Sequence, residues 1–296
     1  MNISVIIPIY NAEKFLDELF ESLEKNHFEE GDEILLIDNG SSDKGVEMCK
    51  LIVEKEPKLY RYLLYTEKAD SYAARNFGVR NAHNEVLVFT DSDCKPKANW
   101  IKMIKQSIKP GEVVAGKITL EKKIDNVWEN FDSIAHLQSS NDAKNNNVAT
   151  ANMAVYLTDY KKVGFFTERF SGGDFDWSQR AVDKGLKIVF HNDVEVLHPS
   201  RNSLQQILKK EQRIAYGIGY SARLSGKSFL LIKLKMCLKV LKIDTNIRYR
   251  RKLKKLGMNR EQLHEFDNAF WKIRFDQIKY MERGYKGINA RSMNLK

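Results

Sequence analysis

Short apolar runs alternate with stretches of helical periodicity along the first half of the chain. The apolar runs are ISVIIPIY (3–10), DEILLID (32–38), YRYLLYT (60–66) and EVLVFT (85–90), and the helical stretches cover 12–25, 43–55, 71–82 and 98–108. This alternation predicts βαβ units, with a mostly parallel central sheet and helices on both of its faces. Several runs are apolar at consecutive positions, as in strands that are buried on both sides. The predicted fold class is therefore α/β.

The pattern changes in the second half of the chain. Residues 112–123 are typical of a strand and 126–139 of a helix, and a Gly-Gly turn precedes a further helix that ends at Gly185. After residue 203 the sequence is helical in character, basic and free of proline. We therefore expect one α/β domain over residues 1–202 and a mainly helical region over 203–296.

Polar residues follow each of the first four predicted strands. In chain order they are Tyr10 and Asn11, Asp38, Glu67 and Lys68, and Asp91, Ser92 and Asp93. Ligands of open parallel sheets bind outside the carboxyl ends of the strands. Because carboxylates stand at three of these four positions, that edge of the sheet suits a hydroxyl-rich or cationic ligand.

The segment VFTDSDC places Asp91 and Asp93 at the end of the fourth predicted strand. Hard carboxylate oxygens suit Mg²⁺ or Mn²⁺, which proteins hold with one or two carboxylates together with substrate phosphates. The same two residues could instead cap the helix that begins near residue 98. The Asp-x-Asp spacing by itself leaves both interpretations open.

Composition and cysteine usage narrow the class of protein. Hydrophobic residues make up 43% and charged residues 30% of the chain, and only five prolines are present, which indicates a folded, soluble protein without long linkers. Cys49, Cys94 and Cys237 are odd in number and far apart, so we expect neither a disulfide framework nor a CxxC zinc cluster, and a reducing, cytoplasmic setting. The first apolar run is too short for a secretory signal and is expected to be a strand.

Several ordered motifs resemble those of the inverting family-2 glycosyltransferases, which share the GT-A fold. The motifs are VIIPIYNAEKFL, LLIDNGSSD, AARNFGVRNA, VFTDSDC, SGGDFDWSQR and HPSR, and together they cover roughly residues 1–201. The resemblance implies a nucleotide-diphospho-sugar transferase fold and the transfer of a sugar from a nucleotide donor, usually a uridine diphosphate.

The resemblance also implies a set of donor-binding residues. They are Pro8, Tyr10, Asp38, Arg75, Asn76, Asp91 and Ser92. An aspartate at a strand end can accept hydrogen bonds from ribose hydroxyls or from a base N–H, but Asp38 could also only cap its own turn. The planar guanidinium of Arg75 suits either the diphosphate or a structural ion pair with Asp91.

By the same resemblance, Asp93 is the expected direct ligand of Mn²⁺ or Mg²⁺, with Asp91 beside it and His198 completing the metal shell. The bound ion neutralises the charge that develops on the diphosphate leaving group. Imidazole suits Mn²⁺ better than Mg²⁺. A histidine before a proline, as here, could equally be a simple turn residue.

The resemblance places the catalytic base at the opening of the helix in SGGDFDW. Family members carry a Glu-Asp pair there, and in this chain Gly173 stands at the first position, so that Asp174 aligns with the base and Asp176 is the second choice. Either aspartate could be a helix cap, since carboxylates are favoured in a first helical turn. Asn152 and Trp177 match acceptor-pocket positions, or belong to the core.

Charge is distributed unevenly along the chain. Residues 1–200 contain 25 Lys and Arg against 32 Asp and Glu, whereas residues 201–296 contain 24 against 7. The apolar, lysine-bearing run 227–243 is too short and too charged to span a bilayer, but it suits an interfacial helix, and the basic cluster 248–255 suits anionic headgroups. A helical subdomain with a solvated basic face is the alternative. No nucleic-acid-binding motif accompanies the cluster, so a nucleic-acid partner is not expected.

Together these observations predict an inverting, metal-dependent glycosyltransferase. Its donor is expected to be UDP-linked, its acceptor a hydroxyl of a glycan or lipid-linked saccharide in cell-surface polysaccharide assembly, and its location the cytoplasm at the inner face of the cell membrane. A catalytically silent protein that binds nucleotide-sugar or lipid, and a basic nucleic-acid-associated protein, remain as alternatives.

Overall fold

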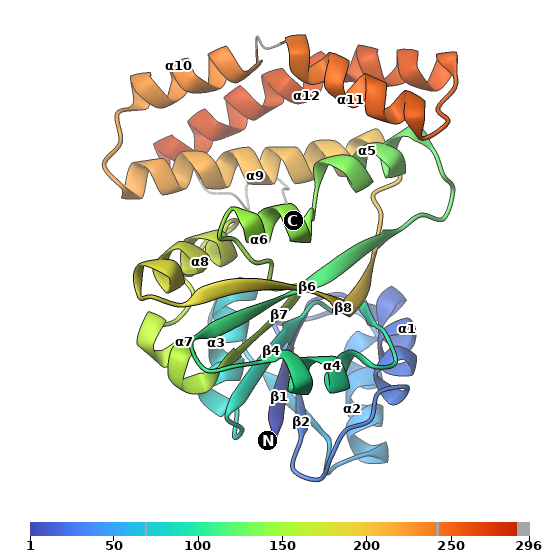
Figure 1. Ribbon diagram of the computed structural model, residues 1–296, viewed down its shortest axis with the longest axis vertical. Helices are drawn as coiled ribbons and strands as arrows, with labels where there is room; N and C mark the ends of the chain where they lie inside the picture. Colours follow the sequence, from blue (N-terminus) through green and yellow to red (C-terminus); the bar gives the residue numbers. More distant parts are fainter. Residues whose placement is uncertain (69, 241–242, 289–296) are drawn as a thin grey trace. The chain divides into compact units, whose positions relative to one another are not determined.

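The computed structural model describes residues 1–68, 70–240 and 243–288 (Figure 1). The strands are β1 (Ile3–Ile9), β2 (Glu33–Asp38), β3 (Tyr60–Leu64), β4 (Val86–Thr90), β5 (Lys95–Pro96), β6 (Glu112–Glu121), β7 (Asn152–Tyr156) and β8 (Lys187–Pro199). The helices are α1 (Glu13–Glu24), α2 (Gly45–Lys55), α3 (Ser71–Asn81), α4 (Trp100–Ser107), α5 (Val127–Ala135), α6 (Ser139–Lys144), α7 (Leu157–Val163), α8 (Gly173–Asp183), α9 (Leu204–Leu224), α10 (Phe229–Val240), α11 (Ile243–Lys255) and α12 (Arg260–Lys286). The predicted α/β class is confirmed.

The strands of the described residues form one eight-stranded sheet in the order β3-β2-β1-β4-β7-β6-β8-β5. The first four strands are parallel, with Ile9 opposite Asp38 and Ile6 opposite Phe89. Strand β7 then runs antiparallel to both β4 and β6. The parallel half follows from the alternation of strands and helices in the sequence, and its carboxyl ends bring Asp38 and the residues after Thr90 to one edge.

Helices cover both faces of the sheet (Figure 1). On one face, α1, α2 and α4 pack on a core that includes Val5, Ile7 and Trp100. On the other face, α3, α7 and α8 pack on a core that includes Ile6 and Trp177. Successive strand residues therefore enter opposite cores, which explains why the strand sequences are apolar at consecutive positions.

The chain packs as two compact units. The first unit comprises residues 1–120, 137–168 and 173–199, and the second comprises 121–136, 169–172 and the described part of the chain from 200 onward. The second unit thus includes two segments that the sequence analysis places within residues 1–202. The division into domains at residue 202 stays a prediction.

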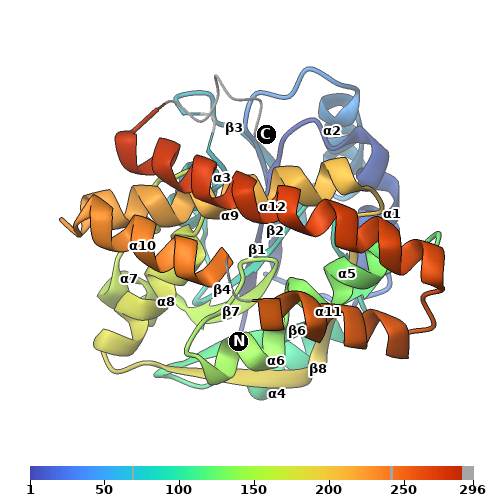
Figure 2. The same ribbon diagram turned by 90° about the horizontal axis from the view of Figure 1, so that it is seen from above.

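Glycines allow the two long helices of the second unit to lie in close contact. A Cβ added to Gly219 of α9 would lie 1.9 Å from the carbonyl oxygen of Met281, and one added to Gly284 of α12 would lie 2.1 Å from that of Tyr216. Only glycine tolerates such an approach of two backbones. Figure 2 shows α12 along α9, with α10 and α11 following one another beside α12.

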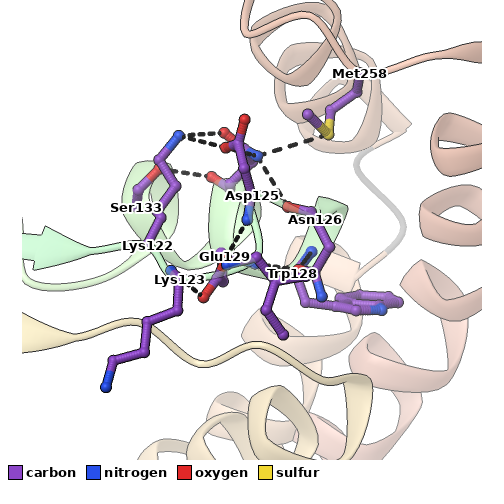
Figure 3. A network of polar contacts seen from close by, with 10 residues as sticks. Lys122, Lys123, Asp125, Asn126, Trp128, Glu129, Ser133 and Met258 are labelled. Atoms are coloured by element: carbon purple, nitrogen blue, oxygen red, sulfur yellow. Dashed lines mark hydrogen bonds and ion pairs between the residues drawn. The ribbon is translucent and has the colours of Figure 1, made fainter.

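Helix α5 begins in a dense polar network (Figure 3). The Asn126 side chain accepts hydrogen bonds from the backbone N–H groups of Trp128 and Glu129. The buried Glu129 carboxylate accepts in turn from the backbone N–H groups of residues 123–125 at 2.6–2.9 Å. These hydrogen bonds satisfy the backbone N–H groups at the start of α5 and in the turn before it. The segment 121–126 is therefore held in one conformation.

None of the helices in the described ranges combines the length and the apolar character that crossing a bilayer requires. The run predicted to lie at a membrane interface corresponds mostly to α10, and residues 241–242 of that run lie outside the described part of the chain.

A buried charged cluster lies in the second unit. His136 is 8% exposed, and its two ring nitrogens lie 2.7 Å from Asp132 and 2.9 Å from Glu211. Burial by itself would lower the pKa of His136, but the hydrogen bonds to the two carboxylates outweigh it and raise the pKa. Arg201 pairs with Asp132 at 3.1 Å, and the histidine and this arginine lower the pKa of Asp132 to about 2 against the effect of burial.

This cluster predicts a pH-dependent stability. Because the folded pKa of His136 is raised, its contribution is fully present below its unfolded pKa of about 6.5 and is lost as the pH rises through the folded pKa. The difference in melting temperature between the wild type and His136→Gln should therefore shrink as the pH is raised from acidic to alkaline values in thermal unfolding experiments. His264→Gln, at an exposed position of α12, is the control and should stay near the wild type throughout. A His136→Gln difference that is constant with pH contradicts the prediction.

Candidate functional site

Asp38 ends β2 and is 1% exposed. Its Oδ1 accepts a hydrogen bond from the Ser41 backbone N–H at 2.9 Å, and its Oδ2 accepts from the Tyr62 hydroxyl at 2.6 Å. Burial and this hydrogen bond raise the pKa of Tyr62, which keeps the tyrosine a neutral donor. Asp38 thus caps its own turn, as one of the two interpretations expected. Each carboxylate oxygen keeps a second lone pair that could accept a hydrogen bond from a ligand.

The end of β1 is tied to the loop after β2. Pro8 lies in β1 opposite Ile37, and Tyr10 follows the strand with 45% of its surface exposed. Asn11 has φ of 47° and accepts a hydrogen bond from the Ser42 backbone N–H at 2.8 Å. This left-handed residue turns the chain sharply after the strand, and Tyr10 lies exposed at the strand end, next to Ile9, which pairs with Asp38.

Arg75 of α3 is the buried cation of this edge. It is 4% exposed, its Nη2 forms an ion pair with Asp91 Oδ1, and its Nη1 donates to the Ser71 carbonyl at 3.2 Å. Its Nε has no hydrogen-bond partner among the described residues. The structural ion pair that the sequence allowed is therefore present, and the unpaired Nε leaves the guanidinium with capacity for a further acceptor.

Asn76, the next residue of the same motif, is engaged inside the fold. Its amide group donates to the Phe166 carbonyl at 2.9 Å, and its Oδ1 accepts from the Phe166 N–H at 3.0 Å and from the Tyr160 hydroxyl at 3.1 Å. At 1% exposure it holds the segment after α7 against α3. Its predicted contact with a nucleotide stays a prediction.

Asp93 and His198 face each other although they are far apart in sequence. The pairing of β5 with β8 sets Lys95 opposite Leu197, and the His198 Nε2 lies 3.6 Å from Asp93 Oδ2. The His198 Nδ1 lies 2.8 Å from the Pro199 carbonyl oxygen, so Nδ1 must carry the proton. Nε2 therefore faces the Asp93 carboxylate, and an imidazole nitrogen opposite a carboxylate oxygen is a pair of ligand atoms that fits a divalent cation between them.

The remaining groups around this position differ in their fitness as ligands. Asp91, Asp93 and Cys94 place one ligand atom each within 4.8 Å of one another, and Ser92 lies half-buried between the two aspartates. Burial, strengthened by the two neighbouring carboxylates, raises the pKa of the Cys94 thiol well above its ordinary value. Carboxylate oxygens suit both Mn²⁺ and Mg²⁺, and the imidazole of His198 favours Mn²⁺, whereas the soft sulfur of Cys94 suits neither ion.

The two aspartates of α8 differ in what they contact. Asp174 Oδ1 accepts from the Tyr72 hydroxyl at 2.9 Å. Asp176 Oδ2 accepts from the Thr167 hydroxyl at 2.7 Å and pairs with Arg180 at 3.2 Å. Arg180 also donates to two backbone carbonyls of residues 163–165, so Asp176 belongs to a structural tie. Among the described residues Asp174 forms no such ion pair, so its carboxylate is engaged by the Tyr72 hydroxyl and not by a cation.

Tyr72 also explains why a glycine, Gly173, stands where family members are expected to carry the glutamate of the Glu-Asp pair. A Cβ added to Gly173 would lie 2.9 Å from three atoms of the Tyr72 ring. The space that a glutamate would need is therefore filled by the tyrosine whose hydroxyl bonds Asp174. Sequence inspection missed Tyr72 and Tyr62, because a tyrosine within a helix or strand carries no spacing signal for the carboxylate it contacts.

Asn152 and Trp177 lie in the core, the second of the two interpretations that the sequence allowed. Asn152 is 1% exposed, accepts from the Trp100 indole at 2.9 Å and donates to the carbonyls of Lys117 and Val194. Trp177 is fully buried, donates to the Gly164 carbonyl and stacks on Tyr160. Both side chains are buried and hydrogen-bonded inside the fold, and their acceptor role stays a prediction.

Comparison with known proteins gives one family. Residues 4–180 match the model of glycosyl transferase family 2. Glycosyltransferase AglE of Haloferax volcanii is 31% identical over 221 residues, which cover 73% of this chain and 72% of that protein. A Methanococcus voltae protein named dolichyl N-acetyl-alpha-D-glucosaminyl phosphate 3-beta-D-2,3-diacetamido-2,3-dideoxy-beta-D-glucuronosyltransferase is 24% identical over 247 residues, covering 73% of this chain and 71% of that protein.

The fold is that of solved glycosyltransferases. The mannosyltransferase PcManGT from Pyrobaculum calidifontis, solved in complex with GDP-Man and Mn²⁺, superimposes with a TM-score of 0.63 over 97% of this chain and 88% of that chain, at 14% identity. This likeness supports the GT-A fold predicted from the motifs. The family model covers more than half of the residues, and the chain belongs to glycosyl transferase family 2.

Proposed function

We propose that this glycosyltransferase is a metal-dependent, inverting enzyme that moves a sugar from a UDP-linked donor to a hydroxyl of a glycan or lipid-linked saccharide. The observation that carries the proposal is the opposition of Asp93 and His198 at the carboxyl edge of the sheet, with the His198 Nε2 3.6 Å from Asp93 Oδ2. Asp91, held by the buried Arg75, lies within the same cluster.

Asp93 and His198 would hold the metal ion in this proposal, with Asp91 oriented by Arg75. When bound, the ion neutralises the negative charge on the diphosphate leaving group. The buried guanidinium of Arg75 would favour the anionic diphosphate by its charge, and its unpaired Nε would donate to a phosphate oxygen only if the surrounding side chains moved, because that atom is buried. Asp38 and the exposed ring of Tyr10 would take the ribose and the base.

Asp174 is the proposed base. The Tyr72 hydroxyl bonds its Oδ1, which orients the carboxylate and leaves Oδ2 to accept the proton of the acceptor hydroxyl. The acceptor oxygen then attacks the anomeric carbon from the side opposite the diphosphate, forms the new glycosidic bond, and expels the nucleoside diphosphate with the bonding electrons. One displacement of this kind inverts the anomeric configuration.

The acceptor class rests on the relatives. The name of the Methanococcus voltae protein describes transfer onto a dolichyl phosphate-linked sugar, which supports a lipid-linked saccharide as the acceptor here. Such an acceptor places the reaction at a membrane. We propose that the transfer takes place at the cytoplasmic face of that membrane. PcManGT was solved with GDP-Man, so a donor panel must include guanosine as well as uridine diphosphate sugars. Binding of a donor with Mn²⁺ but without hydrolysis or transfer would instead favour a catalytically silent binding protein.

Replacing the base tests the chemical step. Asp174→Asn should lower kcat by about 10²- to 10⁴-fold while donor affinity stays close to the wild type, because the carboxamide keeps its size but cannot take a proton. Transfer is measured as release of nucleoside diphosphate with the acceptor present. Asp176→Asn is the matched control: it loses the Arg180 pair, so it should lower the melting temperature and change kcat by only a few fold. Retained transfer in Asp174→Asn would move the base to Asp176.

Replacing the ligands tests the metal site directly. Asp93→Asn and His198→Gln should each weaken Mn²⁺ binding by about tenfold or more, measured by calorimetric titration without donor or acceptor. Cys94→Ser should leave the Mn²⁺ affinity unchanged, because the buried neutral thiol is not expected to be a ligand. Loss of Mn²⁺ binding in the Cys94 variant with retention in the other two would refute the proposed donor set.

Two tyrosines distinguish donor binding from chemistry. Tyr62→Phe removes the donor to Asp38 and should raise the KM for the sugar nucleotide, whereas Tyr72→Phe removes the donor to Asp174 and should lower kcat. Each change should be about 10- to 150-fold, because one hydrogen bond to a charged group contributes about 1.5–3 kcal/mol. Steady-state kinetics with varied donor concentration reads both. The reverse pattern, or no change in either variant, would contradict the assignment of the two carboxylates.

A further inference from the structure

Helix α10 is apolar on two opposite sides. One side packs inside the second unit: Met236 is 7% exposed in a small core with Ala215 and Met281, and Ile232 packs against it. Phe229 of the same side contacts the Tyr285 ring, with 5.0 Å between the ring centroids. These buried contacts hold α10 against the second unit. They cover only part of the apolar surface of the helix.

The opposite side of α10 carries exposed leucines. Leu230, Leu231, Leu234 and Leu238 are 74%, 59%, 54% and 55% exposed. At 3.6 residues per turn these four positions fall on one side of the helix, away from Ile232 and Met236. Single exposed leucines are ordinary on a protein surface, but an aligned row of four on one helix is a contiguous apolar face.

Helix α11, the next element, has a basic outer side. Tyr249 and Leu253 pack inward, with Leu253 completely buried. The outer side carries five exposed cations, Arg248, Arg251, Lys252, Lys254 and Lys255. α10 and α11 follow one another beside α12 (Figure 2), so the leucine face and the basic face belong to consecutive helices of the same unit.

We propose that the outer sides of α10 and α11 form a docking surface for an anionic phospholipid bilayer. The leucines of α10 enter the acyl boundary, and the arginines and lysines of α11 contact the lipid phosphates. Neither part is sufficient by itself, because stable interfacial binding needs both apolar insertion and electrostatic attraction. Charge decides against a second copy of the chain, since residues 201–296 contain 24 Lys and Arg against 7 Asp and Glu and two such surfaces repel each other. Nucleic acid would match the cations but leave the leucine face exposed to water.

Vesicle flotation of the full chain tests this proposal, without sugar donor or acceptor. The protein should float with vesicles of phosphatidylcholine mixed with phosphatidylglycerol, should not float with phosphatidylcholine alone, and should be released as salt is raised. Because no transfer is measured, the outcome is independent of whether the proposed chemistry is right.

Two paired variants separate the parts of the surface. Leu231→Gln with Leu234→Gln should weaken vesicle binding by about tenfold or more, and Leu224→Gln, which changes an equally exposed leucine at the end of α9, should not. Arg251→Gln with Lys255→Gln should also weaken binding by about tenfold or more, and Lys161→Gln with Lys162→Gln, which changes two exposed lysines of α7, should not. Unchanged melting temperatures show that each variant is folded.

Three results would overturn the proposal. The first is a wild-type protein that does not float with anionic vesicles at low salt. The second is equal loss of binding in the control variants, which would indicate diffuse attraction by net charge. The third is an oligomer, seen by analytical ultracentrifugation, that the leucine substitutions dissociate while vesicle binding persists, because the face would then belong to a second copy.

Discussion

The buried guanidinium of Arg75 is the interaction on which the candidate site depends. It pairs with Asp91, donates to the Ser71 carbonyl and lies 5.6 Å from the centre of the Tyr72 ring, while the Tyr72 hydroxyl bonds Asp174. One cation thus connects the carboxylate after β4 with the carboxylate that opens α8. Several carboxylates at one edge of a sheet repel each other unless partners hold them apart. Here Arg75 and two tyrosine hydroxyls provide those partners for Asp91, Asp38 and Asp174.

This arrangement separates the tasks of chemically similar groups. Asp38 and Asp174 each accept a hydrogen bond from one tyrosine hydroxyl. A hydroxyl orients the carboxylate and leaves its charge in place, whereas a lysine or arginine would neutralise that charge. Asp176, two residues after Asp174 in the same helix, is paired with Arg180 and stabilises the turn before α8. The proposed division of roles between Asp174 and Asp176 therefore rests on the partner of each aspartate and not on the aspartate itself.

The second unit follows a different physical logic. Its core contains a buried histidine between two carboxylates, and its two long helices meet through glycines, so it is well ordered inside. Its outer helices nevertheless leave leucines and cations exposed. Exposed leucines do not stabilise an isolated unit. The proposed partner, a bilayer with an apolar interior and anionic headgroups, would account for both the exposed leucines and the exposed cations.

Much of this protein was determined by the sequence itself. The alternation of apolar runs and helical stretches predicts the parallel half of the sheet, and parallel strands bring Asp38, Asp91 and Asp93 to one edge because their carboxyl ends coincide. The motifs also identify the family and the pair Asp174 and Asp176. Only the tertiary structure decided what each of these groups contacts. It buries Asn152 and Trp177, places His198 opposite Asp93 through the β5–β8 pairing, and fills the space beside Gly173 with Tyr72. Local patterns specify which side chains follow a strand or open a helix, whereas burial and hydrogen-bond partners come from residues distant in the chain, which no local spacing records.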